Sequence, residues 1–199
     1  MSRHIAKSIK KEAKMGELKD YSGEFIRQFR YDDFSKEMLE NIICEYGRLY
    51  ELMDGLWYST VAEEVGPEKS WEFEMKVWRR IVRHVLGGVK KAANIEGNDL
   101  YTMFKAVQLD PCYTKGLYQY DIYIRDPKYA LMTIYRCPSL LYFEKTDPGR
   151  IKPLCQDLEP TAFQDYADFF NPKIKVKPLK LPPRKRPDDI PVCVWEYRL

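Results

Sequence analysis

Three cysteines in the last third of the chain could carry chemistry, because each lies at the edge of an expected element: Cys137, Cys155 and Cys193. Cys137 directly precedes Pro138, so we expect it at the start of a helix. Unpaired backbone N–H groups and the helix dipole favour a thiolate there, and Arg136 adds to that effect. Cys137 is therefore the candidate nucleophile. Burial would act in the opposite direction, and a buried thiol that only packs is the alternative.

Two further residues could act as acid or base beside this thiol. Asp157 follows Cys155 in the sequence Cys-Gln-Asp, before a helix expected to begin at Pro160. Its carboxylate could serve as acid or base, orient a histidine, or only cap that helix. His84 lies off the apolar stripe of its helix, and it is either a base or ligand, or a surface histidine. Cys137, Asp157 and His84 are the predicted catalytic residues.

The aromatic residues indicate a place for a ligand. The chain has 15 tyrosines and four tryptophans, and such side chains build the core first and line apolar pockets second. Together with two of the cysteines they give the predicted ligand-binding set, which consists of Trp57, Trp78, Cys155, Cys193 and Trp195.

A cofactor is not specified by any motif. Three cysteines and Asp157 could bind zinc tetrahedrally, although no closely spaced Cys-x-x-Cys pair is present. The sequence also lacks a His-Glu-x-x-His pair, a glycine-rich phosphate loop and a Gly-x-Ser-x-Gly elbow. These absences disfavour nucleotide enzymes and standard metalloproteases, and leave zinc as an open alternative.

The elements that must position these residues fall into two kinds. Apolar residues recur at helical spacing over 35–65, again after Pro67, and in a shorter helix over 99–108. From Leu117 the period changes to that of strands, and Asp126-Pro127-Lys128 separates two strands of a hairpin over 117–136.

The rest of the chain alternates short helices with strands. We expect a short helix from Pro138, a loop ending at Cys155, a helix from Pro160, and strands over 173–181 and 192–199. The pattern predicts an α+β fold, with N-terminal helices packed on a small, mostly antiparallel sheet into which short helices are inserted.

The predicted domain organisation is a basic N-terminal extension over 1–34 and a single α+β domain over 35–199. That domain has a helical half over 35–110 and a sheet half over 116–199. Residues 1–20 carry only a weak apolar stripe. They read as a frayed or loosely docked helix, and the alternative is an interfacial helix or an arm that binds a protein partner.

Charge and hydropathy limit the function classes. The net charge of +3 is too small to indicate nucleic acid. The basic run 173–186 fits a solvated edge strand, where lysines prevent unwanted pairing, although it could also meet nucleic acid or an acidic partner. No apolar run approaches the roughly 18 residues of a membrane span, and no signal peptide opens the chain. We therefore expect a cytoplasmic protein with reduced thiols.

The sequences RCPSLLYFEK, LCQD, FFNPKIKV and VCVWEYRL occur in an order that resembles a known family. They are similar to the L-2-amino-thiazoline-4-carboxylic acid hydrolase-like proteins, and most to an uncharacterised cytosolic branch of bacteria and archaea. The segment MDGLWYSTVAEEVGPEKSWEFEMKVWRR also resembles that branch, whose members have a Trp-containing helix, a glycine and a second Trp-containing helix. More distantly, the cysteine-rich ending is similar to vinyl-four-reductase domains, which bind small hydrophobic molecules and can hold zinc.

The resemblance implies a shared pocket marked by Cys137, Cys155, Asp157 and Cys193. The branch often has a further cysteine before the Pro-Pro pair, where this chain has Lys180 and Leu181, so a four-cysteine metal site is disfavoured. The implied function is a small-molecule pocket, hydrolase-like if it is catalytic, acting on a C–N or C–S bond of a small heterocycle. The alternatives are a non-catalytic module that binds a small molecule or zinc, and an accessory subunit of a larger complex.

Overall fold

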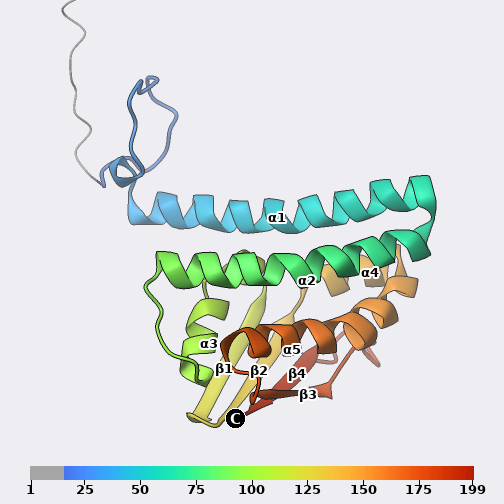
Figure 1. Ribbon diagram of the computed structural model, residues 1–199. Helices are drawn as coiled ribbons and strands as arrows, with labels where there is room; N and C mark the ends of the chain where they lie inside the picture. The colour runs from blue at the N-terminus through green and yellow to red at the C-terminus, as the bar shows by residue number, and fades with distance from the viewer. Residues whose placement is uncertain (1–15) are drawn as a thin grey trace, which may run out of the picture. The chain divides into compact units, whose positions relative to one another are not determined.

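The computed structural model describes residues 16–199 (Figure 1). The chain divides into two compact units, one ending at Glu45 and the other running from Tyr46 to Leu199. The division falls within a helix, whereas the sequence suggests a boundary at residue 34, which stays a prediction. The helix or arm expected over residues 1–20 lies almost wholly outside the described residues.

The described part of the first unit leads into the first long helix. Tyr21, Phe29 and Phe34 pack their rings together, with centroids 5.8–6.4 Å apart. A 3-10 turn follows at Tyr31–Asp33, and α1 then spans Lys36–Val65. The Ser35 hydroxyl accepts a hydrogen bond from the Met38 backbone N–H at 3.1 Å, so Ser35 is the N-cap of α1.

The second unit begins with the rest of α1 and with α2, Pro67–Ala92. Gly66 turns the chain with a φ of 88°, a conformation that glycine adopts without strain, and Pro67 opens α2. The Ser70 hydroxyl donates to the Tyr58 carbonyl at 2.8 Å, so the two helices are joined near the turn. Figure 1 shows them running antiparallel.

A short helix and a hairpin come next, as the sequence predicts. The helix α3, Leu100–Val107, is capped by Asp99, whose carboxylate accepts from the Thr102 N–H at 2.8 Å. The strands β1, Gln119–Asp126, and β2, Tyr129–Arg136, form the expected antiparallel hairpin.

The last third differs from expectation in one connection. The predicted loop ending at Cys155 is wrong, because a 3-10 turn at Pro148–Arg150 and a π-helical turn at Pro153–Leu158 run directly into α5. Each proline lies at the first position of a helical turn, where a backbone N–H would have no partner within the helix, so its absence costs no hydrogen bond. The remaining elements follow the prediction: α4 Pro138–Thr146, α5 Glu159–Phe170, β3 Lys175–Lys180 and β4 Cys193–Arg198.

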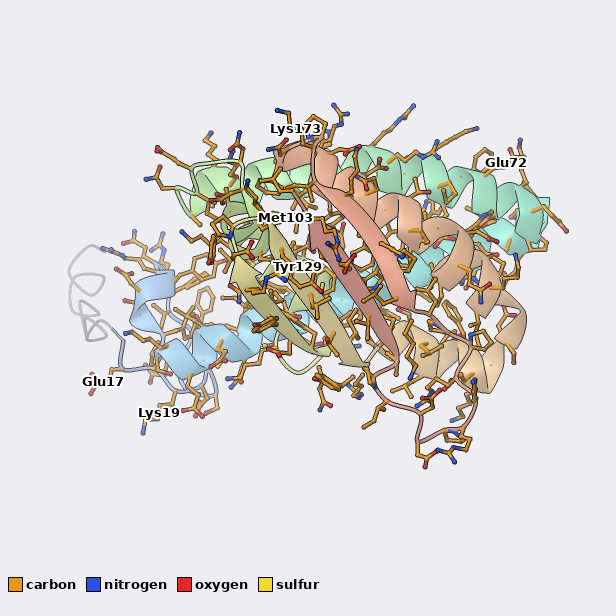
Figure 2. All side chains as sticks on the ribbon, turned by 90° about the horizontal axis from the view of Figure 1, so that it is seen from below. Glu17, Lys19, Glu72, Met103, Tyr129 and Lys173 are labelled. Atoms are coloured by element: carbon orange, nitrogen blue, oxygen red, sulfur yellow. The ribbon has the colours of Figure 1, made fainter. Side chains whose placement is uncertain are left out.

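The four strands form one antiparallel sheet in the order β1-β2-β4-β3, so the α+β class is confirmed. Figure 2 shows the sheet from below with Tyr129 labelled at the start of β2. Met132 pairs with Trp195 across β2 and β4, and both side chains are fully buried beneath the helices. The strand β3 lies at an edge and exposes Lys175 and Lys177, the arrangement that favours a solvated edge.

Within residues 16–199, no helix combines the length and the apolar character that crossing a membrane requires.

Candidate functional site

A cavity of about 490 Å³ lies in the second unit, where its helices meet the start of the sheet. A volume of this size matches pockets that take small organic molecules. Its walls come from α1, α2, the segment before β1, α4, the π-helical turn and α5. The lining residues form two groups that differ in chemistry, called its apolar side and its acidic side.

One side is apolar and aromatic. It is built by the residues Tyr113, Leu117, Tyr118, Pro138, Tyr142, Phe143, Leu154, Leu158, Ala162 and Phe163. The phenol of Tyr113 lies against Tyr118, with ring centroids 5.4 Å apart. Such a wall binds the hydrocarbon part of a ligand by removing its surface from water.

The other side is acidic. Carboxyl groups of Glu51, Asp54, Glu74 and Glu159 line it, and burial raises the pKa of each. For the three glutamates the pKa rises to about 7. Carboxyl groups with such values change protonation state near neutral pH, which is typical of functional sites.

The acidic side depends on an unusual orientation of α1. This helix turns Glu51, Asp54 and Tyr58 inward, whereas Met53 and Trp57 are exposed. An ordinary amphipathic helix does the reverse and buries its apolar face. The helix therefore turns its acids toward the cavity and leaves apolar side chains exposed. Helices that depart in this way from the usual burial of the apolar face are found most often at functional sites.

Glu51 is held by neutral donors. The Ser139 hydroxyl lies 3.4 Å from its Oε2, and the Cys112 thiol donates a second hydrogen bond. These bonds favour the carboxylate, but burial acts more strongly in the opposite direction. The thiol of Cys112 thus lines the cavity as a donor, and its own pKa is raised well above the usual value, chiefly by burial.

Glu74 is only 3% exposed and pairs with Arg150, whose Nη2 lies 3.2 Å from its Oε2. The guanidinium of Arg150 is also packed 3.5 Å from the ring centroid of Tyr58 and 4.6 Å from that of Phe143. Its charge partly offsets the effect of burial on Glu74 and on Asp54. Asp54 accepts a further hydrogen bond from the Trp78 indole.

Glu159 differs from the other three acids. Within residues 16–199, no hydrogen bond or ion pair joins its carboxylate to another side chain. Burial is the main cause of its raised pKa and the charge of Glu51 is the second, so both influences disfavour the ionised form. A cavity-lining carboxyl without a partner is the group best placed to meet a ligand.

A buried network lies behind this wall. The Asp110 carboxylate accepts from the Tyr166 hydroxyl at 2.8 Å and from the Cys112 N–H at 2.8 Å. Burial raises the pKa of Asp110 despite these bonds. The network fixes the segment that carries Cys112 and so supports the donor that holds Glu51.

The three cysteines predicted from the sequence lie near one another: Cys137 raises the pKa of Cys155 and of Cys193, and Glu159 raises the pKa of all three. None of them is among the residues that line the cavity.

Cys137 caps α4 as predicted, since its sulfur accepts from the Leu140 N–H at 3.4 Å. The cap does not produce a thiolate, because burial outweighs it and raises the pKa of Cys137 to about 11. Desolvation also raises the pKa values of Cys155 and Cys193. The packing alternative therefore describes these thiols better than a nucleophile.

The other predicted residues are distributed over the molecule. Asp157 is exposed and pairs with Lys152 at 3.2 Å, and His84 lies on the exposed side of α2. Neither lines the cavity, and neither does Trp57, which is exposed. Trp78 lines it. Trp195 is buried behind the wall and stacks on Phe163, with centroids 4.2 Å apart.

For zinc, the described residues offer no suitable arrangement: among them no group of three or more histidine, cysteine, aspartate or glutamate side chains is placed to hold a metal ion.

The cavity acids were missed by the sequence reasoning, although three of them left a signal. Glu51 and Asp54 lie three residues apart and share a helix face with Tyr58. Glu74 interrupts the stripe formed by Trp71, Met75 and Trp78. An acid on the buried face of a helix indicates a partner or a site, and this signal was available before the structure.

Comparison with known proteins adds no relative: no family profile, no curated protein and no solved structure matches the chain. The family resemblance and the pocket residues it implies stay predictions.

Proposed function

We propose that this protein binds a small organic molecule in the cavity of its second unit. The observation that carries the proposal is the mixed lining, in which aromatic side chains and four carboxyl groups share one cavity. Glu51 and Glu159 are half-buried there, which is unfavourable for the fold alone, because each carboxylate would be more stable in solvent. A ligand that binds these carboxyl groups would compensate for the water that they lose.

The proposal is tested by filling the cavity. Ala162 of α5 lines it, so Ala162→Phe places a ring in the ligand's space. Ala92→Phe, at the exposed end of α2, adds the same ring outside the cavity. Native mass spectrometry with a library of small aromatic compounds is expected to show binding to the wild type and to Ala92→Phe, and its loss in Ala162→Phe. Binding that is equal in all three proteins would contradict the proposal.

A hydrolase is the second candidate, and the shared titration range of Glu51 and Glu159 favours it. Two carboxyl groups with pKa values of about 7 can divide the roles of acid and base at neutral pH. The Glu159 carboxylate would take a proton from water as the water oxygen attacks carbon. Glu51, protonated, would donate its proton to the nitrogen or sulfur that leaves.

This candidate is tested with L-2-amino-thiazoline-4-carboxylic acid, the compound that the family resemblance suggests. Product formation should be abolished in Glu51→Gln and in Glu159→Gln while Glu63→Gln, an exposed acid of α1, retains the wild-type rate. Turnover that survives in both cavity variants would exclude these carboxyl groups as the acid and base.

A further inference from the structure

The acidic side of the cavity divides into two regions. At one, Arg150 pairs with Glu74 and also favours the ionised form of Asp54. At the other, the charge of Glu51 raises the pKa of Glu159, and Glu159 has no hydrogen bond or ion pair to any side chain within residues 16–199. The lining as a whole holds four carboxyl groups and two guanidinium groups, those of Arg48 and Arg150.

From this arrangement we infer that the cavity takes an organic cation, a protonated amine on an aromatic or aliphatic body, with the amine bound by the carboxyl groups of Glu51 and Glu159 that line it. The inference rests on the proposed function, since it names the ligand class of the same cavity. The aromatic wall formed by residues such as Tyr118 and Phe163 receives the body of the ligand.

The chemistry of the two carboxyl groups selects against other ligands. An anion would be repelled by Glu51 and Glu159 where they are ionised, and would gain no charge-assisted hydrogen bond from them where they are protonated. A neutral ligand of the same shape leaves the desolvation of the carboxyl groups uncompensated. A protonated amine donates charge-assisted hydrogen bonds, which are the strongest of those a carboxylate can accept in such a site. A metal ion is a poorer fit, because the described residues hold no suitable group of ligands.

Binding of a cation is coupled to proton release. Because the pKa values of Glu51 and Glu159 are about 7, the free protein holds protons there at neutral pH. A bound cation favours the carboxylates and expels these protons. Affinity for an amine that stays protonated should therefore rise by about tenfold from pH 6 to pH 8 for one ionising carboxyl.

The thiols and phenols around the pair do not ionise in this range, whereas Glu74 of the same cavity does, since its pKa is also about 7. Burial raises the pKa of every thiol and phenol that faces the two glutamates, so these groups stay neutral. They are Tyr50, Cys112, Tyr113, Tyr118, Cys137, Cys155, Cys193 and Tyr197. Asp54 and Asp110 also face Glu51, and burial raises the pKa of both. The test therefore separates the glutamates from these aspartates by substitution.

The experiment compares matched probes by isothermal titration calorimetry. Phenyl, naphthyl and indolyl compounds, each with the same two-carbon chain, end in an amine, an alcohol or a carboxylate. The proteins are the wild type, Glu159→Gln, Glu51→Gln and the exposed control Glu63→Gln. Titrations in two buffers of different ionisation enthalpy report protons released on binding.

We expect the tightest amine to bind the wild type and Glu63→Gln at least about tenfold better than its alcohol, with proton release at pH 7. In Glu159→Gln this preference should fall severalfold, with less proton release, and Glu51→Gln should act in the same direction. Alcohols that bind as tightly as amines would overturn the cation inference and leave the proposed function standing. A wild-type protein that binds no probe at millimolar concentration would overturn both.

Discussion

Replacing Glu159 with glutamine should stabilise the protein at alkaline pH and leave its stability unchanged at acid pH. The pKa of this carboxyl is about 7 in the folded protein, against an ordinary value of 4.5. Below pH 4.5 the group is protonated in both folded and unfolded chains, and it causes no loss of stability. Between pH 4.5 and about 7 the unfolded chain is ionised while the folded protein keeps its proton, so stability falls over this range, and the full loss is present above pH 7.

The size of the effect follows from the same two values. The difference between 4.5 and about 7 corresponds to about 3 kcal/mol when both states are ionised. Water that enters the cavity reduces this figure, and we expect Glu159→Gln to gain about 1–3 kcal/mol at pH 8.5. At pH 4, below the ordinary value, the carboxyl is mostly protonated in both the folded and the unfolded chain, and the difference should be close to zero.

Urea unfolding followed by tryptophan fluorescence measures this difference, because all four tryptophans, Trp57, Trp71, Trp78 and Trp195, belong to the second unit. The midpoint of Glu159→Gln should exceed that of the wild type at pH 8.5 alone. In the control Glu63→Gln the exposed carboxyl is removed, and the midpoint should match the wild type at both pH values. A Glu159→Gln variant no more stable than the wild type at pH 8.5 would refute the reasoning.

Three other changes follow from single contacts. Arg150→Met leaves the buried Glu74 without its cation, so it should cost about 3 kcal/mol in urea unfolding at pH 8, and less at pH 5, where the acid is protonated. In Gly47→Ala a new methyl group would lie 2.7 Å from the Pro111 carbonyl oxygen, so the melting temperature should fall. Gly55→Ala adds a methyl group in open space, so the melting temperature should rise slightly. A melting temperature unchanged in Gly47→Ala would show that α1 can move away from Pro111. The pKa of Cys137 is raised to about 11, so iodoacetamide at pH 7.5 should alkylate this thiol far more slowly in the folded protein than in urea, and equal rates would contradict its burial.

Much of the fold could be predicted because it depends on local signals. The change of apolar period near Gly116 separated helices from strands, and the hairpin over 117–136 followed from it. The helices expected over 35–65 and 99–108 begin directly after Ser35 and Asp99, whose side chains accept capping hydrogen bonds. The connection before α5 was predicted as a loop ending at Cys155, although its prolines each open a helical turn.

The site was harder to predict because it depends on which face of a helix turns inward. The apolar residues of α1 were expected to mark its buried face, and the structure instead turns Glu51 and Asp54 to the cavity. Cys137 was predicted as the nucleophile because cysteine is a reactive residue type. Its reactivity depends on burial, which raises its pKa and which spacing along the chain does not reveal. Glu159 becomes notable only once the structure shows that its carboxyl lines the cavity without a hydrogen bond or ion pair to another side chain within residues 16–199.

The most direct test of an acid-lined ligand cavity is a carbon-13 NMR titration of protein labelled at the glutamate carboxyl groups. Glu51→Gln and Glu159→Gln assign the two signals. We predict that both carboxyl groups titrate near pH 7 in the free protein, and that a saturating arylalkylamine moves their titration to lower pH. Signals that titrate near the ordinary value of 4.5, and that no probe displaces, would contradict the account.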